Sequence, residues 1–87
     1  SLKLFSQQVS VEPTGLFAWD ALAGSYFSEG LHDRATAAAW KLVDLALVEK
    51  APDLLARAYH HLALVQMEKQ RDDLAIDYLR RGILASG

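Results

Sequence analysis

The sequence predicts an all-α fold of antiparallel helical hairpins, and three observations support this prediction. Alanine and leucine dominate the chain, β-branched residues are sparse, and no segment alternates polar and apolar residues with a period of two. Apolar residues instead recur at helical spacing, as Trp19, Leu22, Ala23 and Tyr26 do at i, i+3, i+4 and i+7. The 87 residues are enough for one small domain with a thin core.

Five helices are expected along the chain, over residues 2–9, 16–28, 33–49, 53–68 and 73–85. Pro13 marks a break before the second helix, and Pro52 immediately precedes the fourth, because a first helical turn does not need the N–H that proline lacks. Asp33 and Asp73 stand in first turns, where a carboxylate is favourable. Short turns precede both residues, so each pair of helices joined there runs antiparallel.

The chain repeats itself at a spacing of 40 residues. When the sequence is shifted by this distance, the identities include Leu22 with Leu62, Ala23 with Ala63, Asp33 with Asp73 and Ala35 with Ala75. Small residues where two helices of a hairpin cross let their axes approach closely. We therefore interpret the two halves as one structural unit that occurs twice.

The first unit resembles the tetratricopeptide repeat family. That family has the pattern Trp-x2-Leu-Gly-x2-Tyr, followed by Ala-x3-Phe and later by proline. Here Trp19, Leu22, Ala23 and Tyr26 match the first part, with alanine in place of the small glycine, and Ala35 matches the alanine of the second.

The second unit matches the same pattern less closely. Tyr59, Leu62 and Ala63 match its first part and Ala75 its second, whereas Gln66 stands where the pattern has an aromatic residue. The spacing of 40 residues also exceeds the usual tetratricopeptide period of about 34, and HEAT and armadillo repeats of about 40–47 residues remain structural alternatives.

The resemblance implies a fragment of a right-handed α-solenoid. Residues 1–13 would be a packing helix or the tail of a preceding repeat, in which Phe5 and Pro13 have the spacing of the family's Phe and Pro. Residues 14–52 and 53–87 would be the two repeat units. About three units are needed to bury such a stack. We therefore expect the chain to belong to a larger protein, and its open apolar end to meet further repeats or a second copy.

Composition and motifs argue against several classes of function. A net charge of −2 does not supply the positive field that nucleic-acid binding needs, and no apolar run approaches the roughly 20 residues that span a bilayer. The chain has no cysteine, which is typical of a cytoplasmic protein. We expect no direct contact with nucleic acid or membrane, and a cytoplasmic location.

No catalytic or metal site is expected either. His60 and His61 are adjacent, so on a helix they point about 100° apart, and no acidic or histidine partner follows at i+3 or i+4. We expect them to be solvated or bonded locally. The glycines form no phosphate-binding loop, and no nucleophile has a base partner. The sequence therefore predicts a protein that is not an enzyme and holds no cofactor or metal.

The tetratricopeptide resemblance implies a concave groove, lined by the first helix of each unit, that holds a segment of a partner. The residues expected on this face are Phe17, Asp20 and Phe27 in the first unit, and Arg57, His60, Leu64 and Met67 in the second. The phenylalanines, Leu64 and Met67 would supply apolar contact, and the other three would set polarity. The alternative is that Phe27, Leu64 and Met67 are buried against neighbouring helices.

The function expected from these observations is that of a scaffold that binds a protein or peptide. Two alternatives stay open at this point. One is a regulatory domain that senses a ligand or peptide within a larger bacterial regulator. The other is a homo-oligomerisation module.

Overall fold

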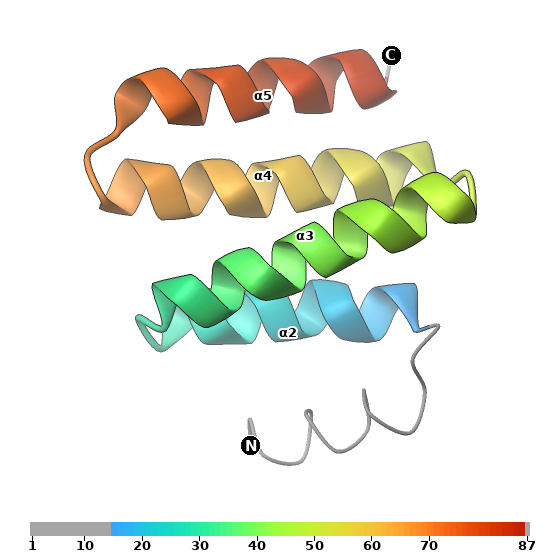
Figure 1. Ribbon diagram of the computed structural model, residues 1–87, viewed down its shortest axis with the longest axis horizontal. Helices are drawn as coiled ribbons and strands as arrows, with labels where there is room; N and C mark the ends of the chain where they lie inside the picture. Colours follow the sequence, from blue (N-terminus) through green and yellow to red (C-terminus); the bar gives the residue numbers. More distant parts are fainter. Residues whose placement is uncertain (1–14, 87) are drawn as a thin grey trace.

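The computed structural model describes residues 15–86, and these form four α-helices and no strand (Figure 1). The helices are α2 (Leu16–Ser28), α3 (His32–Val48), α4 (Pro52–Glu68) and α5 (Asp72–Ser86). The predicted all-α class is confirmed. The helix expected over residues 2–9 and the break expected at Pro13 lie outside the described residues.

The helix boundaries agree closely with those predicted. The helix expected from residue 16 begins and ends where predicted, while α3, α4 and α5 each begin one residue earlier, at His32, Pro52 and Asp72. Pro52 is itself the first residue of its helix, since the ring sets a helical φ and its missing N–H would have no partner there. At the other ends, α3 stops one residue earlier than predicted and α5 continues one residue further.

One backbone motif closes all three turns between these helices. In each turn an N–H donates to the carbonyl five residues earlier, from Leu31 to Tyr26 (2.9 Å), from Ala51 to Ala46 (2.9 Å) and from Arg71 to Gln66 (2.8 Å). The preceding residue has a positive φ, which is 77° at Gly30, 55° at Lys50 and 58° at Gln70. These are Schellman caps, which satisfy the last carbonyls of a helix. They recur every 20 residues, so each hairpin of two helices spans 40.

The helices pack in chain order, with one additional contact. α2 lies against α3, α3 against α4 and α4 against α5 (Figure 1). α2 also contacts α4. The first helix of one hairpin therefore lies beside the first helix of the next. This contact brings together side chains that are about 40 residues apart in the sequence.

Alanine and leucine, with one valine, make up the core between the two hairpins. The central buried cluster consists of Ala23, Ala38, Ala39, Leu42, Val43, Ala58 and Leu62. The alanines shared by the two units, Ala23 and Ala35 in the first and Ala63 and Ala75 in the second, are all at most 3% exposed. Small side chains at these positions allow the close helix packing that the sequence predicted.

Aromatic rings connect α3 and α4 to the last helix. Tyr78 of α5 stacks on Tyr59 of α4, with ring centroids 6.5 Å apart, and meets Trp40 of α3 edge to face at 6.0 Å. Trp40 remains 37% exposed. α5 packs along α4, and Ala75 is its one fully buried residue among those described.

Candidate functional site

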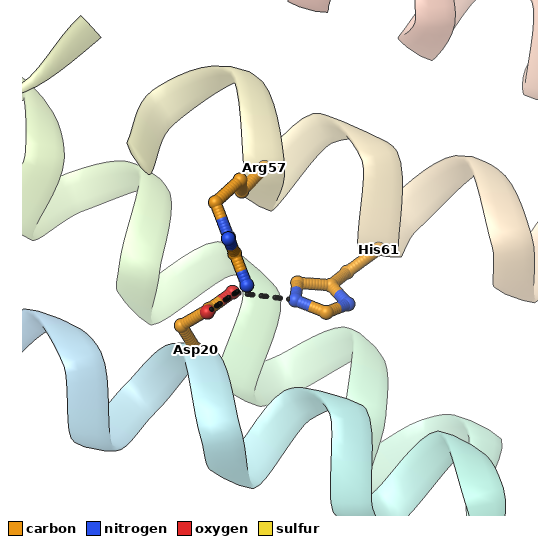
Figure 2. A network of polar contacts seen from close by, with 3 residues as sticks. All are labelled: Asp20, Arg57 and His61. Atoms are coloured by element: carbon orange, nitrogen blue, oxygen red, sulfur yellow. Dashed lines mark hydrogen bonds and ion pairs between the residues drawn. The ribbon is translucent and has the colours of Figure 1, made fainter. Parts of the chain in front are cut away.

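A carboxylate and two basic side chains join α2 to α4. Asp20 lies on α2, and its Oδ2 is 2.7 Å from Arg57 Nη2, while its Oδ1 is 2.7 Å from His61 Nε2 (Figure 2). Both basic residues come from α4. Each carboxylate oxygen thus has its own donor, and the group fixes one hairpin against the other.

The sequence supplies this arrangement through helical spacing. Arg57 and His61 are four residues apart, so they share one face of α4 and can reach the same group. Asp20 is the one acidic residue of α2. Gly24 lies one turn further along α2, and a Cβ there would make an ordinary contact with the imidazole, 3.8 Å from His61 Cε1.

The three side chains differ greatly in their exposure to solvent. The side chains of Asp20 and His61 are 9% and 15% exposed, whereas that of Arg57 is 64% exposed. A carboxylate only accepts hydrogen bonds, so His61 donates its Nε2–H to it. Arg57 donates from one Nη and presents the rest of its guanidinium to solvent. Asp20 and His61 therefore form the buried part of the group, and Arg57 forms its outer part.

Two of the predicted polar site residues are therefore brought together and one is not. Asp20 and Arg57, both expected to set the polarity of an open face, bond to each other, and Asp20 is buried. The third, His60, is exposed to solvent on α4. His61 was expected to be solvated or bonded locally, and this is wrong, because its partner is 41 residues away.

The predicted apolar site residues divide into exposed and half-buried ones. Phe17 is 75% exposed and Met67 is 52% exposed. Phe27 and Leu64 are half-buried, and the ring of Phe27 lies 6.0 Å from that of His32 at the start of α3. The expected alternative, burial of these side chains against neighbouring helices, therefore describes Phe27 and Leu64 in part and does not describe Met67.

An open hollow lies on α4 beside the buried carboxylate. It has a volume of about 330 Å³ and is lined by Ala56, Arg57, His60 and His61. Every polar side chain in this lining is a basic residue type. A surface of this kind suits a carboxylate, with the guanidinium of Arg57 as the strongest donor.

The sequence contains a pattern that indicates a role for His61, but it is easily missed because His60 stands next to it. A single acidic residue on one helix, followed about 40 residues later by two basic residues at i and i+4, is a pattern that a contact between the two helices can satisfy. It becomes informative only once α2 and α4 are known to be neighbours.

Among residues 15–86, no group of three histidine, aspartate or glutamate side chains is arranged so that it could hold a metal ion. None of the four helices has both the length and the apolar character needed to cross a membrane.

Comparison with known proteins adds no relative. A scan against protein-family models finds no family that matches the chain, and searches of curated proteins and of solved structures also find no match.

Proposed function

We propose that the chain is a tetratricopeptide-like interaction module, which binds an acidic and partly apolar segment of a partner protein on the face shared by α2 and α4. In this proposal α2 and α4 are the first helices of two stacked units of an α-solenoid. The 40-residue spacing, the recurrence of the Schellman caps and the contact between α2 and α4 support it.

The observation on which the proposal depends is the position of Arg57. Its guanidinium is held by Asp20 at one edge and is nevertheless mostly exposed. An arginine that is already ordered loses less conformational entropy when it binds than a free one, and its planar group has donors left for a second carboxylate. Asp20 acts in this way as a positioning residue, without contact with the partner.

Other side chains extend the same face. His60 lies three residues after Arg57 and Met67 seven residues after His60, so the three follow one side of α4. Phe17 precedes Asp20 by three residues on α2. Complete burial of a side chain such as Phe17 or Met67 contributes about 1.5–3 kcal/mol. Phe27 and Leu64, already half-buried, would form the floor between them.

The test uses peptides displayed on phage. A library of random linear peptides is selected on the immobilised chain, and binding of the enriched peptides is measured by fluorescence anisotropy. We expect enrichment of aspartate or glutamate next to large apolar residues, with affinity that falls as salt concentration rises. The double variant His60→Glu, Met67→Glu should lose this binding, because it places repulsive charge on the face.

Arg71→Glu is the matched control, since it lowers the net charge by the same amount at an exposed turn residue that is not among those proposed to contact the partner. It should bind the selected peptides as well as the unmodified chain does. The proposal is wrong if the selection enriches no acidic peptides, or if the enriched peptides bind the double variant and the unmodified chain equally.

A further inference from the structure

A second hollow, the α4–α5 hollow, lies between the last two helices. It has a volume of about 240 Å³ and is lined by Ala56, His60, Leu79, Gly82, Ile83 and Ser86. Its apolar side chains are open to solvent, since Leu79 is 39% exposed and Ile83 is 70% exposed. Large apolar side chains at this spacing are typical of a helix face that another helix covers.

The chain itself contains a covered version of the α4–α5 hollow. Forty residues earlier, the corresponding positions are Leu16, Asp20, Ala39, Leu42, Val43 and Ala46, of which the first is half-buried and the other five are buried. α4 is the helix that covers them, because its Ala58 and Leu62 belong to the same buried cluster as Leu42. The turn of three residues between α3 and α4 makes this covering helix run antiparallel to α3. By the same geometry, the open hollow accepts a helix antiparallel to α5.

The polar residue at the edge of the hollow differs between the two units, and this difference indicates which helix fits. In the covered unit the edge residue is Asp20, and α4 meets it with the basic residues Arg57 and His61, which are spaced at i and i+4. In the open unit the corresponding residue is His60, which is exposed. An imidazole has an N–H to donate to a carboxylate whether it is neutral or protonated. A helix that lies on the open hollow as α4 lies on the covered one should therefore carry carboxylates at those two positions.

The floor of the α4–α5 hollow has room for apolar side chains of such a helix. It is formed by the small residues Ala56 and Gly82, and Gly82 lets α5 lie close to α4, because a Cβ there would be 3.4 Å from the carbonyl oxygen of Ala56. Leu79 and Ile83 stand beside this floor on α5. The hollow thus combines an apolar floor and wall with one imidazole.

We infer that the α4–α5 hollow binds an amphipathic helix of a partner protein. This helix runs antiparallel to α5, packs its apolar stripe on Leu79 and Ile83, and directs two carboxylates at i and i+4 toward His60. The hollow shares Ala56 and His60 with the hollow beside Asp20, but its large apolar residues are different ones. The inference does not require the α2–α4 face to bind a partner, and substitutions of the unshared residues test the two proposals separately.

The probe for this inference is a fluorescent peptide with the sequence of α4, residues 52–68, that carries the changes Arg57→Glu and His61→Glu. Its binding to the full 87-residue chain is measured by fluorescence anisotropy. We expect saturable binding and a gain of helicity by circular dichroism, because a helix of 17 residues is marginal alone in water. The peptide with the unmodified α4 sequence is the control. It should bind about tenfold or more weakly, because its basic residues would face His60.

Variants of the chain identify where the acidic peptide binds. Ile83→Glu should weaken its binding about tenfold or more, because it places a charge in the apolar contact. Met67→Glu is the matched control: Met67 is exposed but does not line the α4–α5 hollow, so this variant should bind the peptide like the unmodified chain. Ile83→Glu should in turn still bind the peptides selected on the α2–α4 face. Circular dichroism confirms that each variant keeps its helicity.

Exchanging the charge at His60 tests the polar part of the contact. His60→Glu should weaken binding of the acidic peptide and strengthen binding of the unmodified α4 peptide. The inference is overturned if the acidic peptide does not bind, or if Ile83→Glu binds it as well as the unmodified chain does. It is also overturned if sedimentation equilibrium shows a dimer that Ile83→Glu dissociates, since a second copy would then occupy the hollow.

Discussion

His61 Nε2 lies 2.7 Å from Asp20 Oδ1, and this one hydrogen bond connects α2 to α4 across 41 residues. Both side chains are largely buried, at 15% and 9% exposed. The bond therefore lies where the two hairpins meet, beside the apolar core that α2 and α4 share. Arg57 shares the carboxylate but faces solvent, so the two contacts of Asp20 should differ in strength.

We predict that the bond between Asp20 and His61 contributes more to stability than the ion pair between Asp20 and Arg57. A double-mutant cycle with Asp20→Ala and His61→Ala should give a coupling free energy of about 1–2 kcal/mol in urea unfolding, since the acceptor is charged and shielded from solvent. The cycle of Asp20→Ala with Arg57→Ala should stay below about 1 kcal/mol, because Arg57 is exposed. A larger coupling to Arg57 would contradict this ranking.

We predict that Gln66 makes the folded chain less stable than an apolar residue at the same position would. It is 8% exposed, and its Oε1 is buried with no hydrogen-bond partner among the described residues. Gln66→Leu should raise the free energy of unfolding by about 1 kcal/mol, because a buried acceptor without a partner is unfavourable. Thermal unfolding followed by circular dichroism measures the change. Met67→Leu, at a neighbouring exposed position, is the control and should have little effect; a loss of stability in Gln66→Leu would refute the prediction.

Two glycine-to-alanine substitutions should change the free energy of unfolding in opposite directions. Gly30→Ala should destabilise the chain by about 1 kcal/mol, because residue 30 has a φ of 77°, which a side chain disfavours. Gly24→Ala should stabilise it by up to about 1 kcal/mol, because Gly24 is inside α2 and its new Cβ would make an ordinary contact with His61. Urea unfolding of both variants measures the change in the free energy of unfolding. A change in the same direction for both would contradict the roles of Gly30 as a positive-φ residue and of Gly24 as a residue inside a helix.

Gln70→Gly should stabilise the turn between α4 and α5. Gln70 has a φ of 58° at the position that Gly30 occupies in the first hairpin. Glycine removes the strain of a side chain in this region, although it also makes the unfolded chain more flexible. We expect a net gain of about 0.5 kcal/mol in the free energy of unfolding. Gln70→Ala, which keeps a Cβ, is the control and should show no gain.

The helices and their ends could be predicted from the sequence because their causes are local. Pro52 suits a first helical turn wherever that helix lies, and Gly30 suits a positive φ in any helix cap. The periodicity of Trp19, Leu22, Ala23 and Tyr26 requires only the geometry of one helix. For this reason the predicted boundaries in the described part of the chain differ from the observed ones by at most one residue.

The site could be predicted only in part, because burial is not a property of one helix. Asp20 and Arg57 were expected on an open face, but Asp20 is buried and bonds to Arg57, and their helices alone could not indicate that they face each other. His61 was missed for the same reason, since its partner belongs to another hairpin. Phe17 and Met67 are exposed as expected, whereas Phe27 and Leu64 are partly covered by their surroundings.

By itself, the sequence determined the helical class, the positions of the helices and turns, and the 40-residue spacing of the two hairpins. These follow from spacing, capping and chain length, which act over a few residues. Only the tertiary structure decided that Asp20 is a buried connection between α2 and α4, that Arg57 is ordered but exposed, and that the α4–α5 hollow is left open. Each of these depends on which helix packs beside which, and that is settled by contacts between residues far apart in the chain.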